Sequence, residues 1–467
     1  MRPRNRRSET TLLCGSLLVL LGMTPIKAAP AAGSNDRPST ERPNIVVMVA
    51  DDLGWNDVGY HNPEIRTPHL DRLAASGVRL DQHYVQPQCT PTRVALMTGR
   101  YPSRFGMHCT AASNAQAFPF GTLTMASMLK ARGYATGLFG KWHMGSKPEW
   151  GPNHYGFDYS YGSLAGAVGM YDHRYRLNTP YSKTWHRNHE YIEQPGHATD
   201  LVVDEAVSWL DKHKHQPFFL YVPFHAAHTP IVEGDLQWHE MNNHIKNPSR
   251  RHFAAAVSHL DAAVGRIVEV LKVNGLSERT MVLFFSDNGG IDTPYRGNNY
   301  PPPDPDLEAG FSSNAPLRGG KTTVYEGGMR VPALVSWPGR LDARVVSAPM
   351  HAVDWMPTIA RLVRAQPEAE HGWDGQDIWS QLTSDAPSTN TRRIYWMWGG
   401  GRRVALREGD WKALRPGKDA PWELYNLARD PDESNDVAAA HPDRLKALVA
   451  RYEAERAKDA DQNVSGQ

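Results

Sequence analysis

The amino-acid sequence predicts an α/β protein, with a doubly wound, mainly parallel sheet followed by a smaller C-terminal sheet-and-helix subdomain. Short apolar runs alternate with longer amphipathic stretches, and four of these runs end at polar or charged residues. After about residue 391 the pattern changes to short, closely spaced strands. Alternating strands and helices favour a parallel sheet with helices on both faces. Ligands bind outside the carboxyl ends of the strands in such folds, so we expect the polar residues to converge there.

Four apolar runs have the length and the content of β-branched or aromatic residues that indicate buried strands. They occupy residues 44–50, 134–139, 217–222 and 281–285. The residues just beyond these strands are acids, an amide, a lysine and histidines: Asp51, Asp52, Lys141, His143, His225, His228, Asp287 and Asn288.

Amphipathic stretches between the strands predict the helices of the large domain. Apolar residues recur at helical spacing in 123–132, 200–213, 251–274 and 355–364. We predict a large domain over residues 43–390 and a subdomain over residues 391–467. The subdomain is predicted to contain four short strands and a final helix, at 393–398, 404–407, 411–414, 423–426 and 442–458.

The first 31 residues have the composition of a signal peptide. A basic head is followed by a short apolar run over 12–21 and then by small residues, with a plausible cleavage site at 29–31. The apolar run is too short for a membrane anchor, so we expect a secreted or periplasmic protein. The net charge of +1 argues against a dedicated nucleic-acid binder.

Cys89 is the most unusual residue of the chain. Pro91 suits the first turn of a helix that continues from Thr92 to Thr98 and stops at Gly99. The thiol therefore lies just before a helix N-terminus, where free N–H groups favour anions, and Arg93 adds a positive charge. This is a place for a nucleophile and an anionic ligand.

Each polar segment also has an ordinary structural interpretation when it is taken alone. Asp51 and Asp52 could cap a helix, Asp287-Asn288-Gly289 could form a turn, and Lys321 could be a solvated surface lysine. Their equivalent positions around one unusual cysteine favour a shared site.

These residues resemble the signature of the type I sulfatases. Cys89-Thr-Pro-Thr-Arg93 with the downstream Thr98-Gly99-Arg100 matches the pattern C-x-P-x-R followed by T-G-R. The similarity runs from about Pro43 to the end of the chain. It includes further segments around the predicted site: Asp51-Asp52-Leu-Gly-Trp, Gly140-Lys-Trp-His143, His225 to Pro230, Asp287-Asn-Gly-Gly and Glu326-Gly-Gly-Met-Arg330-Val-Pro.

The resemblance implies an alkaline-phosphatase-like fold and a modified nucleophile. In that family a maturation enzyme oxidises the cysteine to formylglycine (3-oxoalanine), here at Cys89. One hydroxyl of the hydrated aldehyde attacks sulfur, and loss of the second proton expels sulfate and restores the aldehyde. A divalent cation is implied as well, bound by Asp51, Asp52, Cys89 after its modification, Asp287 and Asn288. Oxygen ligands suit Ca²⁺, with Mg²⁺ as the alternative, and argue against zinc.

The resemblance also assigns roles to the basic residues. Arg93 and Lys141 would hold the aldehyde hydrate, and Lys141, His228 and Lys321 would bind the sulfate group. His228 would protonate the leaving sugar oxygen, and His143 would be the base that releases sulfate.

The expected substrate is a sulfated carbohydrate. The segments around Asp51 and Cys89 look closest to the N-acetylgalactosamine-4-sulfatase (arylsulfatase B-like) branch, which implies a 4-O-sulfate on a galacto-configured sugar. A long loop at 291–316 is a candidate lip of the substrate pocket. Three rings could stack on the sugar or belong to the core, and the sequence leaves both open: Trp142, Trp396 and Trp398.

Two other functions remain open from the sequence. Phosphonate and phosphodiester hydrolases on this fold share C-x-P-x-R, and a relative could bind sulfated glycans without catalysis. Zinc phosphatases of the superfamily fit less well, because Gly289 stands where they typically have a histidine.

Overall fold

The structure is a computed structural model, and it describes residues 42–176, 179–294, 307–308, 310–365, 372–384 and 392–460. The predicted signal peptide lies outside these residues. Among the helices that the structure describes, none is both long and apolar enough to span a membrane.

Sixteen strands form three sheets in the described residues. They are β1 (Asn44–Ala50), β2 (Val78–Leu80), β3 (His83–Tyr84), β4 (Ala135–Lys141), β5 (Tyr159–Ser163), β6 (Trp185–Arg187), β7 (Glu190–Tyr191), β8 (Phe218–Pro223), β9 (Thr280–Ser286), β10 (Ala333–Ser336), β11 (Arg344–Val346), β12 (Met350–His351), β13 (Arg393–Trp398), β14 (Arg403–Glu408), β15 (Trp411–Arg415) and β16 (Glu423–Asn426).

The α-helices are joined to these strands by loops and short 3₁₀ turns. They are α1 (Pro68–Ser76), α2 (Cys89–Thr98), α3 (Met125–Ala131), α4 (Ala198–His213), α5 (Leu236–Met241), α6 (Pro248–Val273), α7 (Glu326–Met329), α8 (Trp355–Leu362), α9 (Trp379–Thr383) and α10 (Pro442–Arg456).

The large sheet has the strand order β11-β2-β10-β9-β1-β8-β4-β5-β6-β7. The central strands β9, β1, β8, β4 and β5 are parallel, whereas β10, β6 and β7 pair antiparallel with their neighbours. Strand β1 is paired on both sides, with Val47 opposite Tyr221 of β8 and Leu283 of β9. The predicted doubly wound, mainly parallel sheet is therefore confirmed.

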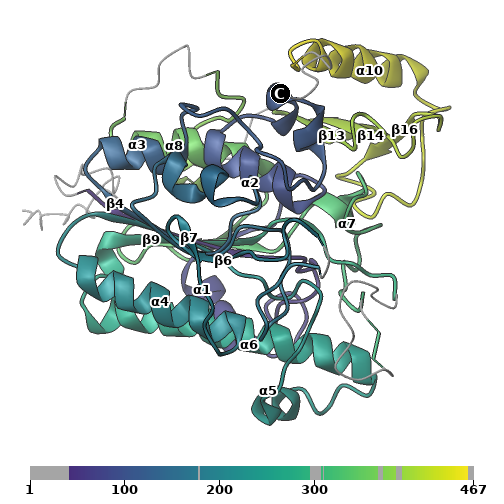
Figure 1. Ribbon diagram of the computed structural model, residues 1–467. Helices are drawn as coiled ribbons and strands as arrows, with labels where there is room; N and C mark the ends of the chain where they lie inside the picture. The colour runs from purple at the N-terminus through teal and green to yellow at the C-terminus, as the bar shows by residue number, and fades with distance from the viewer. Residues whose placement is uncertain are drawn as a thin grey trace, which may run out of the picture. The chain divides into compact units, whose positions relative to one another are not determined.

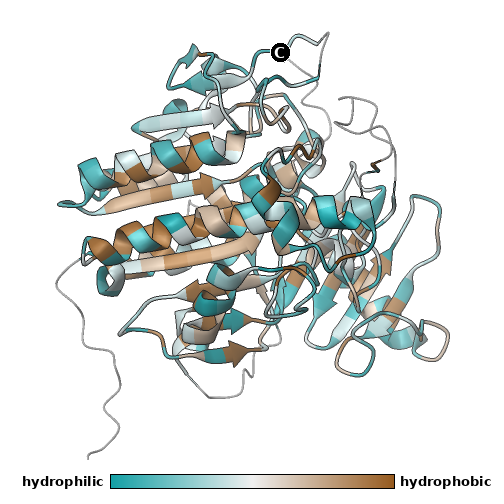
Figure 2. Ribbon diagram, turned by 90° about the horizontal axis from the view of Figure 1, so that it is seen from below, coloured by the Kyte–Doolittle hydropathy of each residue, from teal (hydrophilic) through white to brown (hydrophobic). Residues whose placement is uncertain are grey.

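Helices cover both faces of this sheet (Figure 1). Ile45, Val47 and Val49 of β1 face the core that contains α2, α3 and α8, and the alternate residues of β1 face α1, α4 and α6. A strand buried on both faces needs apolar residues at every position, which explains the unbroken run at 44–50. Apolar residues accordingly concentrate in the central strands (Figure 2).

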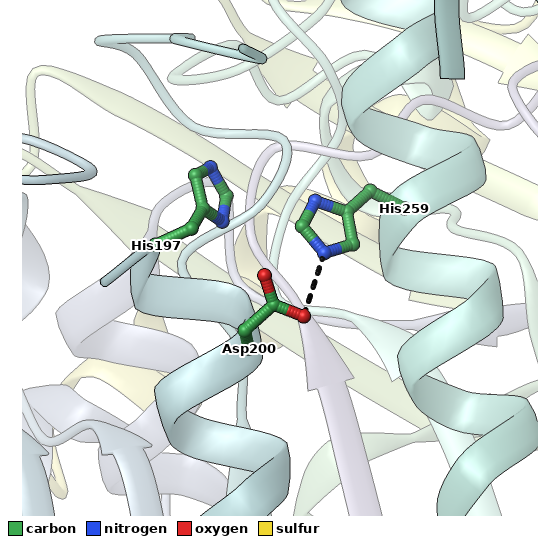
Figure 3. A group of neighbouring side chains, drawn as sticks. All are labelled: His197, Asp200 and His259. Carbon is green, nitrogen blue, oxygen red and sulfur yellow. Dashed lines mark hydrogen bonds and ion pairs between the residues drawn. The ribbon is translucent and has the colours of Figure 1, made fainter. Parts of the chain in front are cut away.

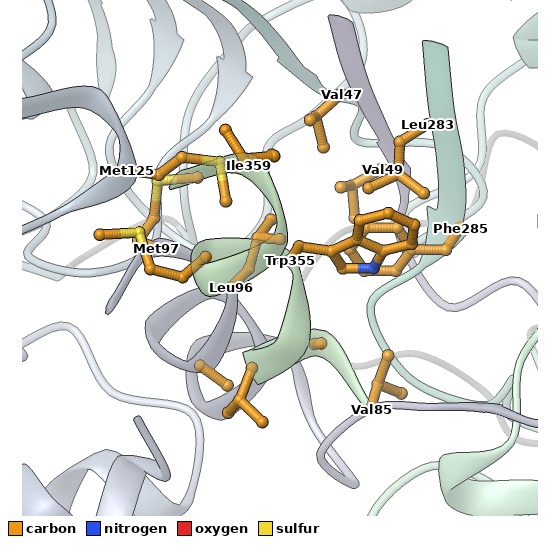
Figure 4. Close-up of a cluster of buried hydrophobic side chains, with 14 of the residues drawn as sticks. Val47, Val49, Val85, Leu96, Met97, Met125, Leu283, Phe285, Trp355 and Ile359 are labelled. Carbon is orange, nitrogen blue, oxygen red and sulfur yellow. The ribbon is translucent and has the colours of Figure 1, made fainter. Parts of the chain in front are cut away.

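The core above the central strands joins elements that are far apart in the sequence. Figure 4 shows β1 and β9 residues packed against Trp355 and Ile359 of α8, with Leu96 and Met97 of α2 beside them. All ten residues of α2 are buried. The helix that begins at Cys89 is therefore fixed by packing along its whole length.

The smaller antiparallel sheet has the order β13-β14-β15-β16, and α10 contacts β14 and β15. It is joined to β3 and α7 of the preceding part of the chain by a fully buried group that we call the subdomain cluster: Tyr84, Glu326, Lys412 and Glu433. Lys412 Nζ lies 2.9 Å from Glu326 Oε1 and 2.8 Å from Glu433 Oε1, and Tyr84 donates to Glu326 Oε2 at 2.6 Å. The predicted small sheet and final helix are confirmed.

Candidate functional site

The predicted site residues follow the carboxyl ends of four neighbouring strands. Asp51 and Asp52 follow β1, and Asp287 and Asn288 follow β9, whose last residue pairs with the last residue of β1. His225 and His228 follow β8, while Lys141 is the last residue of β4 and not a loop residue as the sequence suggested. Parallel pairing brings these chain positions to one edge of the sheet.

Three acids and three bases form the centre of the site, which we call the strand-end cluster: Asp51, Asp52, Asp287, Arg93, Lys141 and Lys321. Lys141 Nζ lies 2.5 Å from Asp51 Oδ2, and Lys321 Nζ lies 2.7 Å from the Asp52 carboxylate. Each acid in this buried group has a cation at hydrogen-bond distance, because a buried charge is stable only when it is paired.

Helix α2 supplies Cys89 and Arg93. The structure begins this helix at Cys89, after Gln88 as N-cap, so the thiol is in the first turn and not just before it. Arg93 Nε and Nη2 donate to Asp287 Oδ2 at 3.1 and 2.6 Å, and Nη1 donates to Lys141 O at 2.9 Å. Arg93 therefore ties the helix to both β9 and β4.

Two buried oxygens beside these acids have no hydrogen-bond partner in the part of the chain that the structure describes: Asp51 Oδ1 and Asn288 Oδ1. Buried polar oxygens are normally satisfied, so these two indicate a missing partner. Oxygen atoms of Asp51 and Asp52 and a ring nitrogen of His228 lie within 4.8 Å of one another, close enough to hold a metal ion. The unpartnered oxygens and the carboxylates fit a hard divalent cation.

Burial and the neighbouring charges shift the pKa values of the acids in opposite directions. Burial, aided by the nearby Asp287 carboxylate, raises the pKa of Asp51 to about 7. Burial also opposes ionisation of Asp52, but the Lys321 ammonium outweighs it and holds the pKa of Asp52 well below its usual range. A divalent cation would offset the repulsion that acts on Asp51.

Three histidines line the site and differ in exposure. The His228 side chain is 18% exposed, and burial together with Lys321 lowers its pKa to about 3. Its Nε2 lies 3.6 Å from Asp52 Oδ2, and its Nδ1 faces Thr229 O at 2.5 Å. His143 and His225 are buried, and burial beside Lys141 lowers both of their pKa values well below the usual range.

His143 is held in an unusual conformation. Its φ of 54° is left-handed, which is uncommon for a residue with a side chain. Its ring packs against Gly166, where an added Cβ would come within 2.2 Å of the ring. Among the described residues, the buried Nδ1 of His143 has no hydrogen-bond partner. Asp52 is also left-handed, with φ 61°, and such strain is typical of functional sites.

Some residues beside the site were not predicted. His225 was seen at the strand end but assigned no role, and its Nε2 lies 2.8 Å from Ser163 Oγ at the end of β5. The Gln88 side chain accepts from the Trp398 indole at 2.8 Å, and Arg403 donates to Thr322 O, the residue after Lys321, at 2.7 Å. The subdomain therefore contacts the residues next to Cys89 and Lys321.

Two of the three candidate sugar-stacking rings belong to the core. Trp142 and Trp396 are fully buried, and their indole N–H groups donate to Trp150 O and Val85 O. Neither ring is accessible to a ligand, whereas Trp398 is half-buried at the end of β13. The candidate lip at 291–316 lies partly outside the described residues.

A family model named "Sulfatase" matches residues 43–365 of this chain. Arylsulfatase J of Mus musculus is 31% identical, over 90% of this chain and 76% of the relative. N-acetylgalactosamine-6-sulfatase of Sus scrofa is 32% identical, over 86% of this chain and 77% of the relative.

A solved structure supports the same comparison. Ps i-CgsB in complex with k-i-k-neocarrahexaose has a TM-score of 0.80 and 32% identity, and the match covers 91% of this chain and 94% of that one.

Proposed function

This chain belongs to the sulfatase family and is therefore a sulfuric ester hydrolase, and from that premise we propose that it removes sulfate from a galacto-configured sugar of a polysaccharide or its oligosaccharides. We propose that Cys89, oxidised to formylglycine, is the nucleophile and that a divalent cation assists it. One observation carries the proposal. The strand-end cluster gathers three acids and three bases around the start of the helix that begins at Cys89.

The cation would be held by Asp51, Asp52, Asp287, Asn288 and an oxygen of modified residue 89. A calcium ion, or magnesium in its place, would lower the pKa of a hydroxyl beside it and offset the charge of the sulfate group. The unpartnered oxygens of Asp51 and Asn288 support this assignment. Arg93 already neutralises Asp287, so it fixes that carboxylate in one orientation.

An unmodified thiol is a poor nucleophile at this position. Burial raises the pKa of Cys89, which disfavours the reactive thiolate, even though Lys141 and Lys321 oppose the shift. A hydrated formylglycine at residue 89 would supply two hydroxyls on one carbon, one to attack sulfur and one to restore the aldehyde as sulfate leaves.

The bases around residue 89 suit a sulfate anion. Lys141 is a buried cation and the Lys321 side chain is 10% exposed, and a bound sulfate ester would approach both. Arg93 and Lys141 would orient the nucleophile. His228 is the most exposed of the three histidines, so we assign it the proton transfer to the leaving sugar oxygen. Its pKa of about 3 applies to the site without substrate, and a bound anion beside Lys321 would raise it. We assign sulfate release to His143, whose Nδ1 has no hydrogen-bond partner among the described residues.

The sugar assignment rests on two supports. N-acetylgalactosamine-6-sulfatase and a carrahexaose-bound structure are among the relatives of this chain, which favours a galacto-configured sugar. The 4-O position rests on the likeness of the segments around Asp51 and Cys89 to the 4-sulfatase branch, while these relatives include 6-sulfatases. The position on the ring is therefore the part of the proposal that the assay below must decide.

Secretion, maturation and domain division complete the proposal. We propose export by the signal peptide at 1–31, oxidation of Cys89 by a formylglycine-generating enzyme, and a division between catalytic domain and subdomain at about residue 391. The loop at 291–316 remains the proposed lip of the pocket.

The experiment measures hydrolysis of a chromogenic aryl sulfate and a matched phosphodiester, together with peptide mass spectrometry of residue 89. We expect sulfate turnover to dominate and residue 89 to be formylglycine. Dominant phosphodiester turnover would support the phosphonate or phosphodiester hydrolase, and binding of sulfated glycans without turnover would support the non-catalytic relative. Active enzyme with an unmodified Cys89 would refute the nucleophile.

Defined oligosaccharides then decide the substrate. We expect sulfate release from chondroitin-4-sulfate or carrageenan fragments, and not from heparan fragments. Preferential release of 6-O-sulfate would overturn the 4-O assignment and leave the galacto-configured sugar intact.

A further inference from the structure

A second group of histidines and acids lies beyond the strand-end cluster. The loop that carries His225 and His228, which we call the histidine loop, runs over residues 224–235 between β8 and α5. Its far end, from Ile231 to Glu233, is held by histidines of three helical segments. His252 of α6 contacts Ile231 O at 3.0 Å, His197 before α4 contacts Val232 O at 3.1 Å, and His239 of α5 contacts Glu233 O at 3.1 Å.

Glu233 is the charged residue of this loop end. Its side chain is only 3% exposed. Within the described part of the chain its ion-pair partners are both histidines, with His259 Nδ1 at 2.9 Å and His197 Nε2 at 3.5 Å. A buried carboxylate is costly unless a cation pairs with it, so one of these two rings must be charged.

Geometry identifies His259 as the charged ring. His197 Nδ1 accepts the backbone N–H of Thr199 at 3.3 Å, so that nitrogen carries no proton and the ring is neutral. Both nitrogens of His259 face carboxylate oxygens instead. His259 Nδ1 lies 2.9 Å from Glu233 Oε2, and His259 Nε2 lies 3.3 Å from Asp200 Oδ1, the contact that Figure 3 shows. Ionised carboxylates only accept hydrogen bonds, so His259 must donate from both nitrogens and is an imidazolium.

We propose that His259 is a positioning residue, whose ring pairs with Glu233 and so fixes the loop that brings His225 and His228 to the strand-end cluster. This inference rests on the proposed function of that site. His259 is 6% exposed on the long helix α6, and Trp238 stacks on its ring at 4.9 Å with an interplanar angle of 12°. The ring is thus a rigid anchor, whereas the loop itself has no regular structure.

The charges around His259 support a proton rather than a metal ion. Ring nitrogens of His197 and His259 and an oxygen of Asp200 lie within 4.8 Å of one another, a spacing that a metal could use. A metal would need unprotonated nitrogens on both rings, yet the Nδ1 lone pair of His197 already accepts from Thr199. Although burial disfavours the charged ring, Asp200 and Glu233 outweigh it and raise the pKa of His259 to about 9.

Other charged or titratable groups also lie near His259. Arg266 of α6 lies 3.8 Å from Asp200, whose side chain is half-exposed. His239 of α5 contacts the backbone carbonyl of Glu233 and not its carboxylate. Because the folded pKa of His259 exceeds the unfolded value of 6.5, its stabilising effect is complete below pH 6.5. The effect declines as pH rises and is lost through about pH 9.

The test compares His259→Gln, Glu233→Gln and the double variant with the wild-type enzyme. His244→Gln is the matched control, because His244 is exposed and donates to Glu64 O without an acid partner. We expect each single variant to lower kcat on an aryl sulfate about tenfold with KM within about twofold, since a misplaced proton donor affects chemistry more than binding. The double variant should lose about the same tenfold and not a hundredfold, because both changes remove one interaction.

Thermal unfolding supplies a second readout that needs no activity. The Tm gap between wild type and His259→Gln should be widest below pH 6.5 and should close towards pH 9. A gap that does not change with pH, or a kcat within twofold of wild type, would overturn the proposal. A rise in Tm with micromolar Zn²⁺ that His259→Gln abolishes would show a metal site instead. If no sulfate ester is cleaved, the proposed function fails, and the Tm gap still tests the pairing.

Discussion

Two buried groups of charged residues in this molecule look alike in composition but differ in where their unpartnered oxygens lie. The subdomain cluster and the strand-end cluster both place carboxylates against lysines in the protein interior. In the subdomain cluster, Lys412 lies between the acids Glu326 and Glu433, and its Nζ is 2.8 Å from Glu433 Oε1, an oxygen without a hydrogen bond among the described residues. In the strand-end cluster two oxygens, on Asp51 and Asn288, have no hydrogen-bond partner in the described part of the chain.

The difference teaches how a structural ion pair is distinguished from a binding site. Burial raises the pKa of one acid in each cluster, Glu433 and Asp51, to about 7, so a raised pKa alone does not mark a binding site. The unpartnered oxygen of Glu433 lies against the Lys412 ammonium, so that network holds two parts of the chain together without a ligand. The strand-end cluster has two unpartnered oxygens and three carboxylates, so it gains from a bound cation. Neutralising an acid should therefore have opposite effects in the two clusters.

The largest expected effect is the loss of activity when Cys89 is replaced. Cys89→Ala should lower kcat by at least about 10⁴-fold, because it removes the atom that becomes the nucleophile. Cys109→Ala is the matched control, since Cys109 is buried and its thiol donates to Ala117 O. The control should lose stability but keep its activity, as measured by aryl sulfate turnover. Equal losses in both variants would show that the effect is structural.

Breaking the subdomain cluster should mainly affect stability. Lys412→Met leaves Glu326 and Glu433 buried without their cation, which should lower the free energy of unfolding by about 3–5 kcal/mol. Urea denaturation measures this, with the exposed Lys446→Met as control. A loss of less than about 1 kcal/mol would contradict the role of the cluster in joining the small sheet to β3 and α7.

Asp51→Asn and Glu326→Gln test the comparison directly. Without metal, Asp51→Asn should be at least as stable as wild type at pH 8, because burial and Asp287 make the charge of Asp51 unfavourable. Glu326→Gln should be less stable, because it leaves Lys412 with one acid fewer. Added Ca²⁺ should raise the Tm of wild type and of Glu326→Gln but not that of Asp51→Asn.

The pH dependence of the stability of the metal-free wild type also tests whether the charge of Asp51 is unfavourable. The folded pKa of Asp51, about 7, lies above the unfolded value of 3.8, so the folded state binds the proton more tightly. Stability should therefore fall as pH rises from about 4 to 7, and Ca²⁺ should reduce that slope. A Tm profile that Ca²⁺ leaves unchanged would contradict the metal assignment.

The smallest effect is expected where the subdomain contacts the site. Trp398→Phe removes the indole donor to Gln88, which should lower kcat/KM about threefold, within the roughly 0.5–1.5 kcal/mol of one hydrogen bond. Trp411→Phe is the control, because Trp411 packs on His441 and Arg444. Identical kinetics for both variants would show that the hydrogen bond between Trp398 and Gln88 has no effect on catalysis at residue 89.

Much of the large sheet could be predicted from the sequence because its strands are buried on both faces. The structure places β1 at the predicted residues and β9 one residue longer at each end than predicted. The short strands β2 and β11 were missed, since three residues are too few to show a period.

The candidate site was predictable because parallel strands bring their ends together. The buried charge pairs of Lys412 and of His259 were not predictable. Lys412 lies between apolar residues in β15, and nothing in the local sequence shows that it is fully buried. Its partners lie 86 residues before it and 21 residues after it, a separation that no local pattern reveals. His259 gave no signal either, because a histidine on an amphipathic helix has no unusual neighbours in the sequence.

The complete burial of α2 restricts when the proposed oxidation of Cys89 can take place relative to folding. Cys89 is 2% exposed, and every residue of its helix is buried against the sheet and α8. Another protein could reach this sulfur only if that packing opened, at the cost of much of the core. The oxidation that we propose therefore belongs to the interval between synthesis and folding, and a chain that folds before it is modified would be stable but permanently inactive.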